Sequence, residues 1–189
     1  MKNEIRIVGG RFRSRKLRFP AAPGLRPTPD RVRETLFNWL RNDIEGARCL
    51  DLYAGSGALG FEAASRGAAL VVQVERDAAV CEALERNRAL LNAEAVNVVQ
   101  AEVGRFLAGP GQPFDVVFLD PPFHRGLVVP CCLALEENGW LSSRAKIYLE
   151  AESVFRPDGL PQNWRALRGG KAGEVGYYLY ERLSSGQFS

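Results

Sequence analysis

Asp51-Leu-Tyr-Ala-Gly-Ser-Gly-Ala-Leu-Gly60 is the stretch of sequence that decides the fold. It overlaps an apolar run at 49–53 that is typical of a buried strand, and it leads into a helical pattern at 59–65. Glycines at such a turn let a ligand approach the backbone closely, and the first turn of the helix offers free N–H groups. The stretch therefore predicts a nucleotide-type loop at Gly55, Ser56 and Gly57.

Outward from this loop, apolar runs alternate with amphipathic stretches. We expect further strands at 70–75, 96–100, 114–119 and 146–150, helices at 78–91 and 127–137, and a closing hairpin at 165–167 and 175–182. Upstream, Thr28-Pro29-Asp30 is typical of a helix start. Near-continuous apolar strands between helices predict an α/β fold, in which a seven-stranded, mostly parallel sheet carries helices on both faces.

Two acidic residues mark the edge of the sheet where these strands end. Glu75 closes the second strand, where its carboxylate can accept hydrogen bonds from both hydroxyls of a ribose. Asp120-Pro-Pro-Phe123 closes the strand at 114–119. Consecutive prolines lack N–H groups and stiffen the backbone, so the local carbonyls are free to face a cleft. An acid, a carbonyl and an aromatic ring together suit a planar base that carries an NH₂ group.

Length and composition limit the class of protein. The 189 residues, 46% of them hydrophobic, fit one domain with a small appendage. No apolar stretch reaches the roughly 18 residues of a spanning helix, and the first residues are charged, so we expect a cytoplasmic location. Four cysteines and one histidine show no metal-ligand spacing, so we expect reduced thiols and no metal. A monomer is the default expectation.

Positive charge is concentrated at the start of the chain. Residues 1–41 contain eleven Lys or Arg against three acids, a net +8 that leaves −5 for residues 42–189. We expect a basic hairpin over 4–19 and a proline-rich linker, which divides the chain into an extension at 1–28 and a main domain at 29–189. Arg11, Arg13, Arg15 and Lys16 are candidates for nucleic-acid backbone contacts, although charge alone leaves a solvated face open.

Three motifs together resemble a known family. Asp51-x-x-Ala-Gly-Ser-Gly-x-Leu-Gly with Asp120-Pro-Pro-Phe is similar to the S-adenosylmethionine-dependent amino-methyltransferases, which have a Rossmann-like class I fold. The strings that begin Arg6-Ile-Val-Gly-Gly-Arg-Phe-Arg-Ser-Arg-Lys-Leu and Gly24-Leu-Arg-Pro-Thr-Pro-Asp-Arg-Val-Arg-Glu resemble the RsmD family. That family methylates guanine N2 in 16S rRNA of the small ribosomal subunit, at the position numbered 966.

The resemblance implies a role for each motif. The cofactor S-adenosyl-L-methionine would be held by Asp51, Gly55, Ser56 and Gly57 at its methionine part and by Glu75 at its ribose. Glu102 stands where the family usually has Asp or Asn near the adenine, so the longer side chain is a departure. Asp120 and the carbonyl of Pro121 would accept the N–H bonds of guanine N2, Pro122 would stiffen the loop, and Phe123 would stack on the base.

Some alternatives stay open at this point. His124 and Arg125 would contact a phosphate or ribose of the RNA, or lie in a merely solvated loop. Either Asp120 or water would take the proton that methylation releases. A DNA amino-methyltransferase uses the same acid-proline-proline-aromatic chemistry, and a ribosome-assembly factor that binds rRNA without catalysis is the alternative from another class. The intact glycine loop, Glu75 and Asp120 argue against the second.

Overall fold

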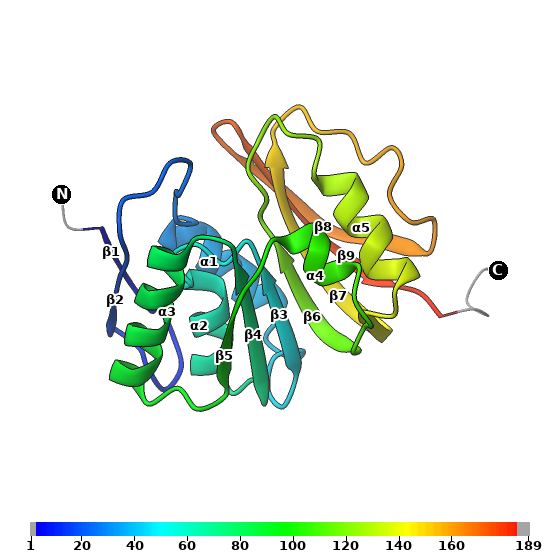
Figure 1. Cartoon of the computed structure of the whole chain (residues 1–189). Coiled ribbons are helices and arrows are strands. Elements are labelled where there is room, and N and C mark those ends of the chain that lie inside the picture. Colours follow the sequence, from blue (N-terminus) through cyan, green and yellow to red (C-terminus); the bar gives the residue numbers. More distant parts are fainter. Residues whose placement is uncertain (1–2, 185–189) are drawn as a thin grey trace.

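A computed structural model describes residues 3–184, and its centre is a seven-stranded sheet in the order β5-β4-β3-β6-β7-β9-β8 (Figure 1). The strands are β3 (Arg48–Leu52), β4 (Leu70–Glu75), β5 (Val96–Gln100), β6 (Phe114–Leu119), β7 (Leu141–Glu152), β8 (Trp164–Ala172) and β9 (Val175–Arg182). The strands from β5 to β7 in this order run parallel, whereas β9 runs antiparallel to both of its neighbours. The predicted α/β fold with a mostly parallel sheet is confirmed.

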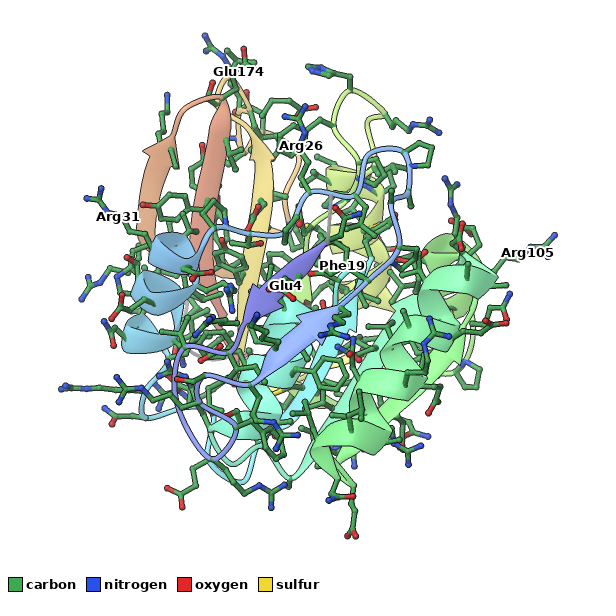
Figure 2. All side chains as sticks on the ribbon, turned by 90° about the vertical axis from the view of Figure 1, so that its left-hand side faces the viewer. Glu4, Phe19, Arg26, Arg31, Arg105 and Glu174 are labelled. Atoms are coloured by element: carbon green, nitrogen blue, oxygen red, sulfur yellow. The ribbon has the colours of Figure 1, made fainter. Side chains whose placement is uncertain are left out.

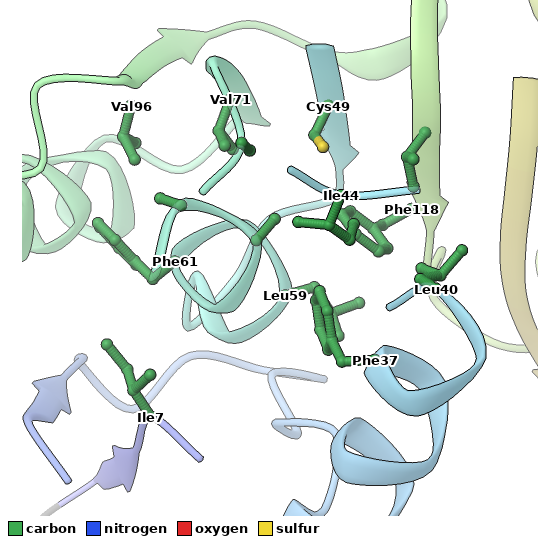
Figure 3. Close-up of a cluster of buried hydrophobic side chains, with 14 of the residues drawn as sticks. Ile7, Phe37, Leu40, Ile44, Cys49, Leu59, Phe61, Val71, Val96 and Phe118 are labelled. Atoms are coloured by element: carbon green, nitrogen blue, oxygen red, sulfur yellow. The ribbon is translucent and has the colours of Figure 1, made fainter. Parts of the chain in front are cut away.

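Helices cover both faces of the sheet, as its apolar strands require. α1 (Asp30–Trp39), α2 (Ala58–Ser65) and α3 (Ala78–Leu91) lie on one face, while α4 (Val103–Leu107) and α5 (Val128–Glu137) lie on the other (Figure 1). Figure 3 shows the first layer, in which Phe37 of α1 packs on Phe118 of β6 and Phe61 of α2 lies on the side of Val71 and Val96. No helix within residues 3–184 is long and apolar enough to cross a membrane.

A separate two-stranded hairpin lies against the first helical layer. β1 (Glu4–Arg6) pairs antiparallel with β2 (Lys16–Arg18), so the predicted small amino-terminal hairpin is present. Its apolar side chains Ile7 and Leu17 are fully buried and join the same core cluster as α1 and α2 (Figure 3). The basic hairpin is therefore packed onto the sheet domain rather than held away from it.

Three elements differ from the sequence-based expectation. Helix α4 was not predicted, because it has only five residues and includes Gly104. Strand β7 begins at Leu141 instead of 146, because its polar first residues pair with β6 across a register shift between Leu141 and Lys146. β8 reaches Ala172 instead of 167, although Gly169 and Gly170 are poor strand formers.

Candidate active site

The candidate active site lies at the edge of the sheet where the parallel strands end, which we call the carboxyl edge. Chain order reverses between β3 and β6, because β3 leads outward to β4 on one side and β6 leads to β7 on the other. In open α/β sheets a ligand crevice opens at such a switch point. The glycine loop follows β3, and the Asp120 motif follows the adjacent β6. The two motifs that the sequence singled out are therefore neighbours.

The glycine loop adopts backbone conformations that explain its composition. Gly55 and Gly57 have φ of 54° and 77°, and Tyr53 also has a positive φ of 60°. A Cβ on Gly57 would lie 2.6 Å from the Cδ2 atom of Leu84 and 2.7 Å from the Phe61 ring. The turn thus packs tightly on α2 and α3.

Asp51 stabilises this loop through hydrogen bonds of its buried carboxylate. Its carboxylate is almost fully buried and accepts hydrogen bonds from the backbone N–H of Gly60, at 3.0 Å, and from the side-chain amide of Gln73, at 3.4 Å. Burial raises the pKa of Asp51 from 3.8 to about 7, against the lowering effect of these two donors. A cation near the loop would restore the ionised form.

Glu75 holds the loop from the end of β4. One carboxylate oxygen accepts the N–H of Gly55 at 3.1 Å, and the other accepts the N–H groups of Arg76 and Asp77 at 2.8 and 2.9 Å. The carboxylate is half-buried and faces the loop. Glu75, which the sequence predicts to bind a ribose, therefore lies beside the glycine loop at the rim of the crevice.

Glu102 has a local structural role. Its two oxygens accept the N–H groups of Gly104 and Arg105, at 3.0 and 2.9 Å, and so cap α4. These backbone donors lower its pKa. The side chain is exposed, and the capping bonds orient it toward its own helix. Glu102 therefore serves as the N-cap of α4, a role that the family's shorter Asp or Asn can also fill.

Asp120 stands beside a second carboxylate that the sequence did not single out. The β6–β7 register pairs Leu119 with Leu149, so Asp120 and Glu150 follow at adjacent strand ends, on the same face of the sheet. Partial burial raises the pKa of Asp120 well above its usual range, and the negative charges of Glu150 and Asp51 raise it further. We call Asp51, Asp120 and Glu150 the carboxylate cluster.

Glu150 ties the proline-rich segment to the site. Its Oε1 atom accepts hydrogen bonds from the hydroxyls of Thr28, at 2.8 Å, and Tyr148, at 2.9 Å. Leu25 of the same segment lies over the glycine loop, since its Cγ atom would be 3.6 Å from a Cβ on Gly55. Residues 20–29 therefore cross the carboxyl edge, and burial raises the pKa of Glu150 beneath them. Thr28 and Glu150 are 122 residues apart, so a single sequence gives no indication of their contact.

A small cavity opens beside the motif, on the side of α5. Its volume is about 160 Å³, and we call it the proline pocket; it is lined chiefly by Pro121, Pro122, Phe123, Leu127, Glu152 and Phe155. The loop that forms it turns through His124 and Gly126, with φ of 60° and 62°. The His124 N–H donates to the carboxylate of Glu152, and Arg125 is exposed.

The predicted nucleic-acid residues fall into two groups. Arg11, Arg13, Arg15 and Lys16 form a basic turn at the opposite edge of the sheet, because the Arg11 N–H donates to the last residue of α2 and the Arg15 side chain to the Leu90 carbonyl in α3. Lys16 also pairs with Glu4 at 2.7 Å. The length of α2, roughly 12 Å, separates this turn from the motif.

Other exposed cations surround the carboxyl edge. Figure 2 places Arg26 on the crossing segment and Arg31 at the start of α1, and it places Glu174 in the β8–β9 turn. Arg125 lies in the loop after β6, and Lys171 lies next to the β8–β9 turn. Of these four residues, only Arg125 is predicted from the sequence to contact RNA.

The residues at the crevice fit a cationic, nucleoside-containing cofactor. The carboxylate cluster has raised pKa values that a positive charge would relieve. The glycine loop offers a close backbone approach, and Glu75 stands at the end of the next strand. Within the described part of the chain, no group of His, Cys, Asp and Glu residues is suited to a metal ion.

Comparisons with known proteins agree with this site. A family model described as "Conserved hypothetical protein 95" matches residues 5–181. Several relatives are named "Ribosomal RNA small subunit methyltransferase D". The one from Escherichia coli (strain K12) is 50% identical over 97% of this chain and 93% of its own length. The one from Haemophilus influenzae is 47% identical over 95% of each chain.

Solved structures extend the likeness to the whole fold. A structure from Escherichia coli, provisionally named methyltransferase yhhF, has a TM-score of 0.88 and 50% sequence identity, and the match covers 97% of this chain and 100% of that one. A precorrin-6y C5,15-methyltransferase from Geobacter metallireducens, at 20% identity and a TM-score of 0.64, shares the fold alone. The predicted Rossmann-like class I methyltransferase fold is confirmed.

Proposed function

Because this chain belongs to the RsmD family, whose model carries the description conserved hypothetical protein 95, we propose that it methylates the exocyclic N2 of a guanine in 16S rRNA. The methyl donor is S-adenosyl-L-methionine, and the guanine is the one numbered 966 in the small ribosomal subunit. The observation that carries the proposal is the Asp120-Pro-Pro-Phe123 motif at the end of β6, next to the glycine loop after β3.

The cofactor would be held by residues of the first two parallel strands. The backbone of Gly55, Ser56 and Gly57 would contact its methionine part above Asp51, and Glu75 would accept hydrogen bonds from its ribose. Glu102 would stand only at the rim of the adenine site, since its oxygens cap α4. When bound, the cofactor supplies a methyl group on a positively charged sulfur, which a nucleophilic nitrogen can attack.

The acceptor nitrogen needs help from the protein, because its lone pair is delocalised into the guanine ring. Asp120 and the Pro121 carbonyl would accept its two N–H bonds and so direct the lone pair toward the donor. Pro122 would keep the loop rigid, and Phe123 would stack on the base, worth roughly 1–3 kcal/mol. Fixed orientation of the two reactants would supply much of the acceleration.

Asp120 is also suited to receive the proton. A carboxyl whose pKa is raised by burial and by neighbouring negative charge holds a proton more readily than an ordinary aspartate. Glu150 contributes to that effect while Thr28 and Tyr148 hold its carboxylate in place. We therefore assign the proton to Asp120 before it passes to water.

The RNA would reach the site at the carboxyl edge with the target base turned out of its stack. His124 and Arg125 would contact the RNA backbone beside that base, and the basic turn (Arg11, Arg13, Arg15 and Lys16) would contact RNA farther away. These phosphate contacts would position the substrate without reading its sequence. A monomer acting in the cytoplasm completes the proposal.

Substrate competition tests the proposal. The protein would be incubated with tritiated S-adenosylmethionine and, side by side, with small subunits that lack the modification, naked 16S rRNA and duplex DNA. We expect label in the small subunits. Label in duplex DNA would replace the proposal with a DNA amino-methyltransferase, and an absence of label despite measurable cofactor binding would favour a non-catalytic assembly factor.

A further inference from the structure

We propose that the proline pocket receives the target guanine and that Glu152 reads its N1–H group, which makes Glu152 a specificity-determining residue. This inference rests on the proposed function and deepens it. It starts from the chemistry of the base. The amino group of guanine is next to a ring N–H donor, whereas the amino groups of adenine and cytosine are next to ring nitrogen acceptors. An enzyme for guanine N2 therefore needs a second acceptor beside Asp120.

The pocket has the size and the walls for one base. Its volume of about 160 Å³ is well below the roughly 300 Å³ at which pockets for drug-sized ligands begin. The rings of Phe123 and Phe155 belong to its lining, together with Pro121 and Pro122. Flat apolar walls favour a stacked planar ligand. The carboxylate of Glu152 is the acidic group of the lining.

The spacing of the two carboxylates suits the two adjacent donors. Asp120 follows a strand whose register places it opposite Glu150, and Glu152 lies two residues farther along β7. With parallel strands about 4.8 Å apart and a rise of about 3.3 Å per residue, the Cα atoms of Asp120 and Glu152 are roughly 8 Å apart. Asp120 directly precedes Pro121 of the pocket lining, so carboxylates at this Cα separation can reach one base edge between them.

Glu152 is oriented and ionised for this task. Its Oε1 atom accepts the N–H of His124, so the motif loop itself holds the side chain in place. That backbone donor lowers the pKa of Glu152, and a carboxylate at neutral pH is an acceptor only. About a quarter of the side chain, 23%, remains exposed.

Glu150 does not fit the same role. Its side chain is only 5% exposed, and its Oε1 atom already accepts the hydroxyls of Thr28 and Tyr148. It is two residues before Glu152 on the same face of β7, but it does not belong to the lining of the proline pocket. The two glutamates of β7 thus have different roles: Glu150 raises the pKa of Asp120, and Glu152 accepts the N1–H of the base.

The test replaces the target guanine with 2-aminopurine, which keeps the 2-amino group and has an acceptor at N1. Small subunits reconstituted with ligated 16S rRNA would carry either base at the target position. Single-turnover rates would be measured for the unchanged protein and for Glu152→Gln, whose amide can donate to that acceptor. Glu174→Gln is the control, because Glu174 is an exposed acid at the same edge of the sheet (Figure 2).

We expect the unchanged protein and Glu174→Gln to prefer guanine over 2-aminopurine by roughly 10- to 100-fold. In Glu152→Gln the rate on guanine should fall, the rate on 2-aminopurine should rise, and the preference should approach one. 2-Aminopurine also lacks the O6 atom of guanine, but this loss affects the unchanged protein and Glu152→Gln alike. The difference in preference between the two proteins therefore reports the contact at N1 alone.

Two other outcomes would overturn the inference. An unchanged preference in Glu152→Gln, or an equal fall on both bases, would mean that Glu152 only supports the loop. Failure of the proposed function is a different result, because the unchanged protein would then form no N2-methylguanosine on guanine-containing subunits. Cofactor binding by Glu152→Gln, measured by calorimetry, verifies that the variant is folded.

Discussion

Asp120 shows how one residue acquires its chemistry from its neighbours. Its sequence context predicts an acceptor for an amino group, but its raised pKa comes from partial burial and from Glu150 on the next strand. The motif residues were predictable because they are contiguous and end an apolar strand. Glu150 was not, since Thr28 and Tyr148 meet it only after folding.

Replacing Asp120 tests its role at the acceptor. We expect Asp120→Ala to lower the single-turnover rate by about 100-fold or more, because N2 loses both its orienting acceptor and its proton acceptor. Binding of S-adenosylhomocysteine, measured by calorimetry, should change little, since that ligand carries no sulfonium charge. A rate within a few-fold of the unchanged protein would remove Asp120 from the mechanism.

The raised pKa of Asp51 predicts how the stability of the protein depends on pH. Its pKa is about 7 in the folded protein and 3.8 in the reference state, so the folded state holds the extra proton between these values. Its contribution to the free energy of unfolding is therefore full below about pH 4 and is lost as the pH rises toward 7, by up to a few kcal/mol. Asp51→Asn should show a shallower fall in Tm from pH 5 to pH 8 without cofactor. Parallel Tm curves for the two proteins would contradict the pKa assignment.

At the scale of elements, a buried ionic contact joins the hairpin to the sheet domain. Glu62 of α2 is fully buried, and its carboxylate accepts the N–H groups of Val8 and Gly9 at 2.9 and 2.8 Å. It also pairs with Arg33 of α1, at 3.4 Å, and with Arg66, at 3.0 Å. Arg33 is itself fully buried and donates to the carbonyls of Thr28 and Arg6. One carboxylate thus holds three elements together.

Glu62→Gln should loosen the hairpin. The two backbone N–H groups bind different oxygens of Glu62, and a glutamine places an NH₂ donor where one of these oxygens accepts; it also removes a negative charge that faces the buried Arg33. We expect a loss of about 3 kcal/mol in the free energy of unfolding and faster hydrogen exchange at Val8 and Gly9. Glu94→Gln, an exposed acid just after α3, is the control. Unchanged exchange at both amides would show that apolar packing alone holds the hairpin.

Most elements follow from their own sequence, and the exceptions have a common cause. The pattern of apolar residues predicts β3 to β6 and α3, because each of these strands is covered on both faces and the helix buries one continuous face. The extension of β8 depends on a partner instead: a Cβ on Gly170 would lie 2.5 Å from the ring of Tyr177 on β9, so the ring covers the glycine. Such cross-strand support is set by tertiary structure and leaves no local pattern.

At the scale of the whole molecule, two groups of exposed cations lie at opposite edges of the sheet. The basic turn is at the edge away from the site, while Arg26 and Arg125 are at the carboxyl edge. The uneven distribution of charge along the sequence favoured a phosphate-binding surface, but the sequence could not place the two groups relative to Asp120. A substrate that reaches both edges must span most of a domain whose radius of gyration is about 16 Å.

This separation predicts how salt dependence varies with substrate. Replacing Arg26 and Arg125 by Gln should lower the salt slope by about 2 for both small subunits and a short stem–loop that carries the target. Replacing Arg11 and Arg13 should lower the slope for subunits only, because a short RNA does not reach the basic turn. Filter binding at several salt concentrations measures each slope. Equal effects of the second pair on both RNAs would contradict this division.

The central claim is that the molecule methylates guanine N2, and the most direct measurement identifies the product. Small subunits that lack the modification would be incubated with the protein and S-adenosylmethionine, and their 16S rRNA would be digested to nucleosides for mass spectrometry. The account predicts close to one N2-methylguanosine per 16S rRNA and no other new methylated nucleoside. N6-methyladenosine, N4-methylcytidine or a methylated ribosomal protein in its place would contradict it.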